Sequence, residues 1–121
     1  MLGLELIAAC APSVAPTTVQ QIIQVESKGN PLALNVNGAS LSRQPRDAAD
    51  AAALARQYIA AGYTVDMGLM QVNSANLPKL GYSVEDMFDT CKNLRAGAEV
   101  LTAFYKIARP RYADDQSALR A

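Results

Sequence analysis

One carboxylate near the N-terminus occupies a position where helical spacing predicts an apolar side chain. Glu26 shares the spacing of one helical face with Ile22 and Ile23, so we expect it to face inward. It also lies at the C-terminal end of that helix, because Gly29 stops it. Burial and the negative end of the helix dipole both disfavour ionisation, so the pKa of Glu26 should rise. A carboxyl that stays protonated near neutral pH can act as a general acid.

The alternative for Glu26 is a structural carboxylate, either partly exposed or paired inside the core. The residues that follow Glu26 favour a functional site over a structural carboxylate. Ser27 can orient the carboxyl or bind a substrate, Gly29 permits close approach, and Asn30 with Pro31 redirects the chain. Taken alone, Ser27 would be an ordinary hydroxyl at a helix C-terminus.

A second polar segment, 68–73, follows a predicted bend at Gly68. Its backbone amides and the long amide side chain of Gln71 are groups that commonly hold sugars, and Asn73 ends the segment. Leu69 and Met70 could line an apolar wall for a sugar ring. The structural alternative places Leu69 and Met70 in the core and leaves Gln71 to cap a turn.

A glycosidase that uses water normally pairs its acid with a second carboxylate across the cleft. Asp66 is the nearest candidate in sequence, although it could equally pin a short strand to its neighbour. Tyr63 could reach sugar hydroxyls as an assisting group.

Composition excludes several other classes of protein. Lys plus Arg number 11, equal to Asp plus Glu, and Trp is absent, so neither a basic surface nor a stacking platform points to nucleic acid. Histidine is absent, which excludes Ser-His-Asp and Cys-His triads and most zinc sites. Cys10 and Cys91 could form a disulfide or remain two buried thiols. No stretch after the first ten residues is long enough to span a membrane.

Periodicity predicts a mainly α fold with a small β component, in a single domain over 1–121. The stretch 47–61 is rich in alanine and should form a helix that ends at Gly62. A longer helix should span 90–108 with one apolar stripe turned inward. That stripe consists of Leu94, Ala98, Leu101, Tyr105 and Ala108.

Shorter elements should surround these helices. The stretches 63–67 and 34–36 are predicted to pair as a small hairpin-like flap. Short helices should follow Gly68 and begin near Ser83, and a last helix should begin near residue 114, after Pro110.

Three motifs, in this order, resemble those of the family 1 lytic transglycosylases. They read VESKGNP at 25–31, GLMQVN at 68–73 and NLRAGA at 93–98. The segments at Cys10 and Cys91 are similar, more narrowly, to the peptidoglycan-cleaving component of type IV secretion systems and conjugation machineries. The resemblance covers nearly the whole chain and implies a lysozyme-like, mostly helical domain with a cleft between its lobes.

The resemblance implies that Glu26 is the single catalytic glutamate. It would protonate the glycosidic oxygen between N-acetylmuramic acid and N-acetylglucosamine, and then take a proton from the muramyl 6-hydroxyl. That hydroxyl would close on the anomeric carbon and leave a 1,6-anhydromuramyl end. Since the substrate supplies the nucleophile, no second carboxylate, metal or cofactor would be needed. Ser27, Gln71 and the backbone of 68–70 match the orienting and sugar-binding positions of the family.

One family motif, an Ala-x-Tyr-Asn-like segment whose tyrosine contacts the catalytic glutamate, has no counterpart before Ala121. We therefore expect the C-terminal part of the family domain to be missing from 1–121. Two further hypotheses stay open. The chain could bind glycan or a secretion-system subunit without turnover, or it could be a hydrolytic muramidase assisted by Asp66.

The narrower resemblance also implies a location. The protein would act in the periplasm on glycan strands, beside secretion-system subunits. A signal peptide is not expected within the chain, because residues 1–10 lack a basic start and contain Glu5. In an oxidising periplasm Cys10 and Cys91 are implied to be bridged.

Overall fold

The computed structural model describes residues 2–108, with side chains described as far as Phe104. Its elements follow in chain order: α1 (Leu4–Cys10), α2 (Pro16–Glu26), β1 (Leu34–Asn37), α3 (Ala48–Ala60), β2 (Thr64–Met67), β3 (Val72–Asn73), η1 (Ser74–Asn76), α4 (Leu77–Leu80), η2 (Glu85–Phe88) and α5 (Thr90–Ala108). The mainly α fold with a small antiparallel sheet is therefore confirmed. The helix predicted near residue 114 lies outside the described residues, as do the side chains of Tyr105 and Ala108.

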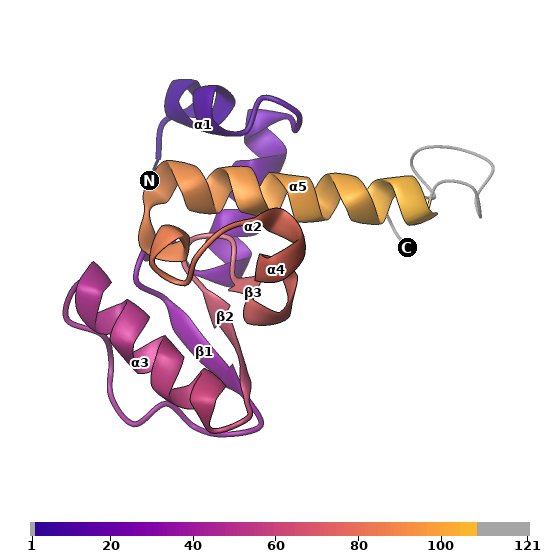
Figure 1. Ribbon diagram of the computed structural model, residues 1–121. Helices are drawn as coiled ribbons and strands as arrows, with labels where there is room; N and C mark the ends of the chain where they lie inside the picture. Colours follow the sequence, from indigo (N-terminus) through magenta and orange to yellow (C-terminus); the bar gives the residue numbers. More distant parts are fainter. Residues whose placement is uncertain (1, 109–121) are drawn as a thin grey trace.

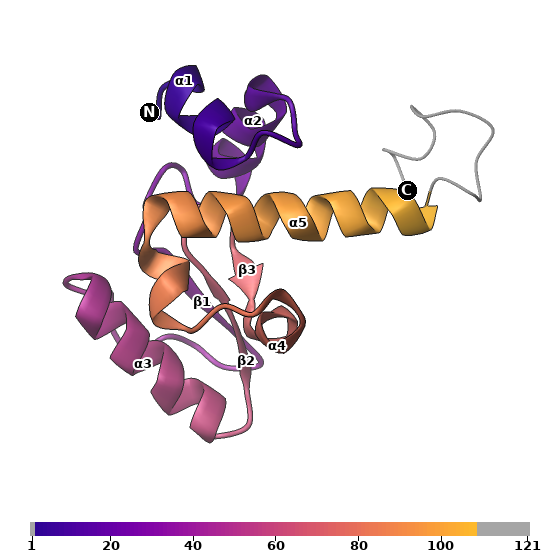
Figure 2. The same ribbon diagram turned by 45° about the horizontal axis from the view of Figure 1, so that its top comes forward.

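The long helix α5 runs through the middle of the molecule (Figure 1). On one side it packs against α1, and on the other lie the sheet and α3, an arrangement that both views show (Figure 2). Leu94 and Ala98 of the predicted stripe are buried and Leu101 is half-buried, which confirms the inward face of this helix. Its C-terminal half extends past the neighbouring elements.

Helix α3 confirms the prediction for 47–61 almost to the residue. Asp47 caps its N-terminus, since the carboxylate accepts a hydrogen bond of 2.7 Å from the amide of Asp50. Beyond its end, Gly62 adopts a φ of +99°, a conformation that favours glycine. The helix turns Ala51, Leu54 and Ala55 into the core.

The sheet has three strands in the order β1-β2-β3, and all neighbours are antiparallel. The predicted pairing of β1 with β2 is confirmed, with Leu34 opposite Met67 and Asn35 opposite Asp66. Strand β3 was not predicted, because two residues are too few to show an alternating pattern. Leu34 and Met67 are buried, whereas Asn35 is exposed and Asp66 half-buried, so one face of the sheet meets the core and the other is polar.

Within residues 2–108, no helix combines the length and the apolarity that crossing a bilayer requires.

Candidate active site

Glu26 is the last residue of α2 and its side chain is exposed, so the expectation that it faces inward is wrong. The helix buries Val19 and Ile23 and half-buries Ile22, but the buried face does not continue into the last turn. Helical spacing fixes the direction of a side chain and does not fix whether another element covers it. In the described part of the chain, the desolvation expected for this carboxyl is absent.

A shallow hollow of about 270 Å³ lies beside Glu26. Its floor is largely apolar, because Ile22 and Val25 belong to it, and Val25 is 78% exposed. Thr18 and Gln21 complete its lining. The carboxylate thus borders an accessible hollow with both apolar and hydrogen-bonding groups.

The chain reverses immediately after Glu26. Ser27 caps α2, because its amide and its Oγ both donate to the carbonyl oxygen of Ile23, at 3.0 and 3.1 Å. The same Oγ accepts a hydrogen bond of 3.3 Å from the amide of Gly29. Lys28 and Gly29 then adopt positive φ angles of 53° and 81°. The hydroxyl of Ser27 therefore stabilises the turn that follows the carboxylate.

The loop 68–71 joins β2 to β3, and hydrogen bonds tie it to the turn after Glu26. Gly68 donates its amide to the carbonyl oxygen of Ala33 at 2.8 Å, and Ala33 donates its own amide to the carbonyl oxygen of Asn30 at 3.2 Å. The two segments that the sequence singled out, far apart in the chain, therefore meet at Ala33.

Both N–H groups of the Gln71 side chain form hydrogen bonds within the protein. Its Nε2 donates to the carbonyl oxygens of Ala33 and Gly68, at 3.1 and 3.0 Å, and its Oε1 accepts 2.7 Å from Nδ2 of Asn35. A primary amide carries two N–H groups, so this side chain can offer a ligand only an oxygen lone pair. The backbone of Gln71 is also unusual, with a φ of +52°.

The apolar residues of this loop belong to the core, which is the alternative that the sequence left open. Leu69 is 2% exposed and Met70 8%. The prediction that Leu69 lines a sugar-binding wall is therefore wrong, since its side chain has almost no free surface. The glycine turn before it points Leu69 inward together with the buried strand residue Met67.

Asp66 and Asn73 face each other across β2 and β3. Nδ2 of Asn73 donates to Oδ1 of Asp66 at 2.8 Å, and Oδ1 of Asn73 accepts from the amide of Ala75 at 3.0 Å. Asn35 lies opposite Asp66 on β1. The three side chains form a polar row across the sheet, and Asp66 does pin its strand to a neighbour as the structural alternative proposed.

Tyr63 lies in a different place from Glu26. Its ring packs edge-on against Tyr58, with 6.2 Å between centroids, and it lines a second hollow of about 520 Å³ together with Leu77 and Tyr82. That hollow shares no residue with the one beside Glu26. The described structure therefore does not bring Tyr63 to the carboxylate.

Sequence reasoning included Asn35 in the predicted flap strand 34–36 but gave it no role at the site. The residue lies in β1 and holds the side chain of Gln71. The alternation of Leu34 and Val36 with Asn35 and Asn37 was the signal that could have placed it on the polar face of a strand.

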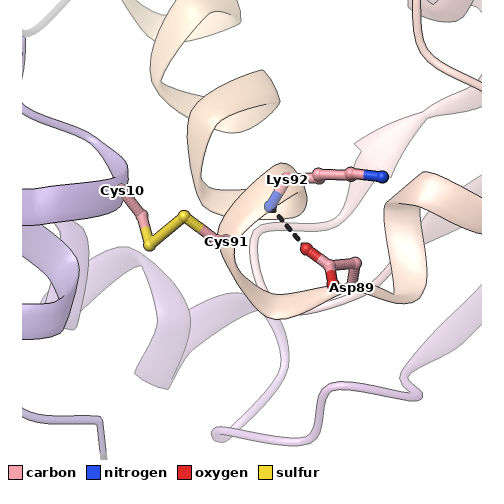
Figure 3. The surroundings of a disulfide bond; sticks show 4 residues. All are labelled: Cys10, Asp89, Cys91 and Lys92. Atoms are coloured by element: carbon pink, nitrogen blue, oxygen red, sulfur yellow. Dashed lines mark hydrogen bonds between the residues drawn. A yellow bond between two sulfur atoms is a disulfide. The ribbon is translucent and has the colours of Figure 1, made fainter.

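A disulfide joins Cys10 at the end of α1 to Cys91 in the first turn of α5, with 5.0 Å between the two Cα atoms (Figure 3). Figure 3 also shows Asp89 beside it, whose Oδ2 accepts 2.9 Å from the amide of Lys92 and so caps the start of α5. The bridge therefore fixes the N-terminal helix to the end of α5 that is nearest the sheet.

Three ion pairs carry the clearest electrostatic effects in residues 2–108. The guanidinium of Arg43 and the amide of Arg46 hold the pKa of Asp50 well below its usual range. The backbone amide of Ser83 and the ammonium of Lys92 lower the pKa of Asp86. Glu85 pairs with Arg56, which lowers the pKa of that carboxyl as well. All of them lie outside the hollow beside Glu26.

Comparison with known proteins identifies the family. Residues 4–115 match the model of the transglycosylase SLT domain. The chain is 43% identical, over 119 residues and 98% of its length, to the type IV secretion system protein virB1 of Brucella suis biovar 1, of which it covers 50%. It is 36% identical, over 107 residues and 88% of its length, to protein virB1 of Agrobacterium fabrum, of which it covers 43%.

The chain thus spans about half the length of these relatives. No solved structure gave a significant match. Because the family model covers nearly all of the chain and the relatives agree with it, the chain belongs to the transglycosylase SLT domain family.

Proposed function

We propose that this protein is a lytic transglycosylase of the cell wall, and that Glu26 is its catalytic acid and base. The observation that carries the proposal is the placement of Glu26, an exposed carboxylate at the edge of a hollow. The turn that follows it is hydrogen-bonded through Ala33 to the loop that carries Gln71. Membership of the transglycosylase SLT domain family supports the reaction class.

The reaction needs a proton donor that later accepts a proton. The carboxyl of Glu26 gives its proton to the glycosidic oxygen between N-acetylmuramic acid and N-acetylglucosamine, and the bond from that oxygen to the anomeric carbon breaks. The carboxylate then takes the proton of the muramyl 6-hydroxyl, whose oxygen bonds to the anomeric carbon. The product is a 1,6-anhydromuramyl end, no water is consumed, and the carboxyl returns to its starting state.

A bound glycan would itself supply the desolvation that Glu26 lacks. Sugar rings lying over the hollow formed by Ile22 and Val25 would displace water from the carboxyl. Ser27, the backbone at Gly68 and Met70, Gln71 and Asn73 are the proposed orienting and binding groups. Gln71 would accept a hydrogen bond from a sugar hydroxyl or acetamido N–H, because its own donors are engaged.

The names of the two relatives support a biological role: one is a type IV secretion system protein virB1, and the other is a protein virB1. We place the protein in the periplasm, where local cleavage of glycan strands would open the wall for a secretion or conjugation apparatus. Subunits of that apparatus are the proposed protein partners.

Digestion of purified sacculi, followed by mass analysis of the released muropeptides, tests the reaction. Transglycosylase activity gives anhydro ends, each lighter by one water than the hydrolysed end. Hydrated reducing ends would instead favour a hydrolytic muramidase, with Asp66 as the second carboxylate on the polar face of the sheet. Binding to sacculi without any release would favour a glycan-binding module.

A further inference from the structure

We propose that Asn93 and Gly97 of α5 are positioning residues for the loop 68–71, and this rests on the proposed function of that loop in glycan binding. Both residues belong to the third sequence motif, at 93–98, which contains neither the proposed acid nor any of the proposed sugar-binding groups. Neither lines the hollow beside Glu26. Both lie on the buried side of α5, one helical turn apart.

Among the described residues, Asn93 is the one polar residue whose side chain is almost completely buried, at 1% exposure. Its Nδ2 donates to the carbonyl oxygens of Met67 and Met87, at 2.9 and 2.8 Å, and its Oδ1 accepts 2.9 Å from the amide of Met70. Both N–H groups and one lone pair are therefore used. A single side chain of α5 thus holds the end of β2, the loop and η2 together.

The loop approaches Asn93 so closely that only glycine fits at its first position. Gly68 has a φ of +75°, and a Cβ built on it would overlap Nδ2 of Asn93 and the carbonyl oxygen of Met87. Any side chain here would push the loop away from α5 and break the bonds that Asn93 makes. The glycine of the second motif and the asparagine of the third are therefore parts of one contact.

Gly97 provides the second point of attachment. A Cβ built on Gly97 would lie 2.5 Å from Sδ and 2.8 Å from Cβ of Met70, so Met70 packs directly on the backbone of α5. Glycine within a helix lowers stability, and this close packing gives a physical reason for it at Gly97. Met70 is thus held through its amide by Asn93 and through its side chain by Gly97.

The residue fixed next in the chain is Gln71. Its φ of +52° is a strained conformation for a residue with a side chain, and it persists only where the surroundings impose it. The attachment of Met70 to α5 imposes it from one side, and the bonds from Nε2 to Ala33 and Gly68 impose it from the other. The direction in which Gln71 presents its oxygen is therefore set from α5, by residues that touch no ligand.

Gly97→Ala separates this role from a merely structural one. Alanine removes no hydrogen bond, but its methyl group overlaps the buried Met70 side chain, so a structural role alone predicts a lower unfolding midpoint with an unchanged kcat of the folded protein. The added methyl group must displace Met70, so a positioning role predicts a less active protein. Glu99→Ala is the matched control, because Glu99 is exposed on the same helix.

The three proteins are compared on soluble glycan strands by kcat and KM, by urea unfolding, and by hydrogen exchange of the Met70 amide. We expect Gly97→Ala to lower kcat at least about tenfold, since misplacement by about 1 Å can cost far more. Its unfolding midpoint should be lower because the methyl group overpacks the core, and its Met70 amide should exchange faster than the lower global stability alone explains. Glu99→Ala should match the parent. Equal kcat and equal Met70 exchange in Gly97→Ala and the parent would overturn the proposal.

The failure of the proposed function would look different. If the parent releases no product, the transglycosylase assignment fails. Two measurements then decide the positioning role: hydrogen exchange of the Met70 amide and affinity for glycan strands. Faster exchange and weaker binding in Gly97→Ala support it, and unchanged values refute it. Asn93→Asp gives a second comparison, because it keeps the acceptor for the Met70 amide but cannot donate to Met67 and Met87. We expect its Met70 exchange to be faster than in the parent.

Discussion

Nδ2 of Asn35 donates a hydrogen bond of 2.7 Å to Oε1 of Gln71, and this bond joins strand β1 to the loop after β2, 36 residues along the chain. The bond fixes the orientation of the Gln71 amide, since the oxygen must face Asn35 while the nitrogen faces Ala33 and Gly68. The sequence indicated that Gln71 could bind a sugar with its side-chain amide. In the structure this amide links β1 to the loop, and only one lone pair of its oxygen remains free.

Gln71→Ala should lower the free energy of unfolding by about 1–2 kcal/mol, because it removes side-chain hydrogen bonds and keeps the strained φ. Gln71→Gly is the matched control: it removes the same bonds but relieves the strain, so it should be more stable than Gln71→Ala by about 1 kcal/mol. Urea unfolding measures both. Equal stability of the two variants would show that the backbone at this position is not strained in solution.

Glu26→Gln should lower the rate of product release from sacculi by at least about a hundredfold, because an amide cannot donate and retake the proton. The fold should persist, since the carboxylate is exposed and a change there alters the unfolding free energy by less than about 0.5 kcal/mol. Mass-resolved muropeptide analysis and urea unfolding measure the two effects. Glu5→Gln, another exposed carboxylate on a helix, is the control and should keep the parent rate. A Glu26→Gln protein as active as the parent would remove Glu26 from the mechanism.

The Cys10–Cys91 disulfide should contribute strongly to stability. It closes a loop with a sequence separation of 81, for which the chain-entropy model gives about 4.5 kcal/mol as an idealised value. The Cys10→Ser/Cys91→Ser protein should therefore unfold at much lower urea concentration than the oxidised parent, and a reductant should shift the parent but not the variant. Alkylation in denaturant without reductant is an independent check, and it should label neither cysteine. Complete labelling of both would contradict the bridge.

Acid should destabilise the protein partly through Asp50. Its pKa in the folded state lies well below the unfolded value, so the folded state binds the proton less readily. The stabilisation is therefore fully present above the unfolded carboxyl pKa of about 3.9 and is lost as the pH falls through the folded pKa. The free energy of unfolding, measured with urea between about pH 5 and pH 2, should fall less steeply with decreasing pH for Asp50→Asn than for the parent. The Glu5→Gln protein should follow the parent, and parallel curves for all three proteins would exclude this contribution.

The sequence predicted the elements whose burial pattern repeats over several turns. Helix α3 and the inner face of α5 at Leu94 and Ala98 were found because periodicity accumulates over a long stretch. Strand β3 was missed because two residues carry no period. The exposure of Glu26 was missed because burial depends on which element lies opposite, and a helical pattern contains no information about its neighbours.

For the candidate site, the sequence located the segments but not their contacts. Gln71 and Gly68 were recognised as a polar turn, yet their partners Asn35 and Asn93 depend on the register of β1 and on the rotation of α5. Such contacts arise between residues more than 20 positions apart in the chain, and local patterns cannot specify them. Resemblance to a family supplied the motif order, and the structure supplies the reason why the three motifs lie together.

The bridge between α1 and α5 also constrains the order of folding. Helix α1 is made first, but its partner Cys91 emerges only after almost the whole described chain has been synthesised. Contacts of such high sequence separation form late, because the loop between them must be closed first. Helix α1 also packs against α2, which follows it directly in the chain, so only its covalent attachment has to wait for α5. The disulfide therefore locks an almost complete fold and cannot guide the early steps of folding.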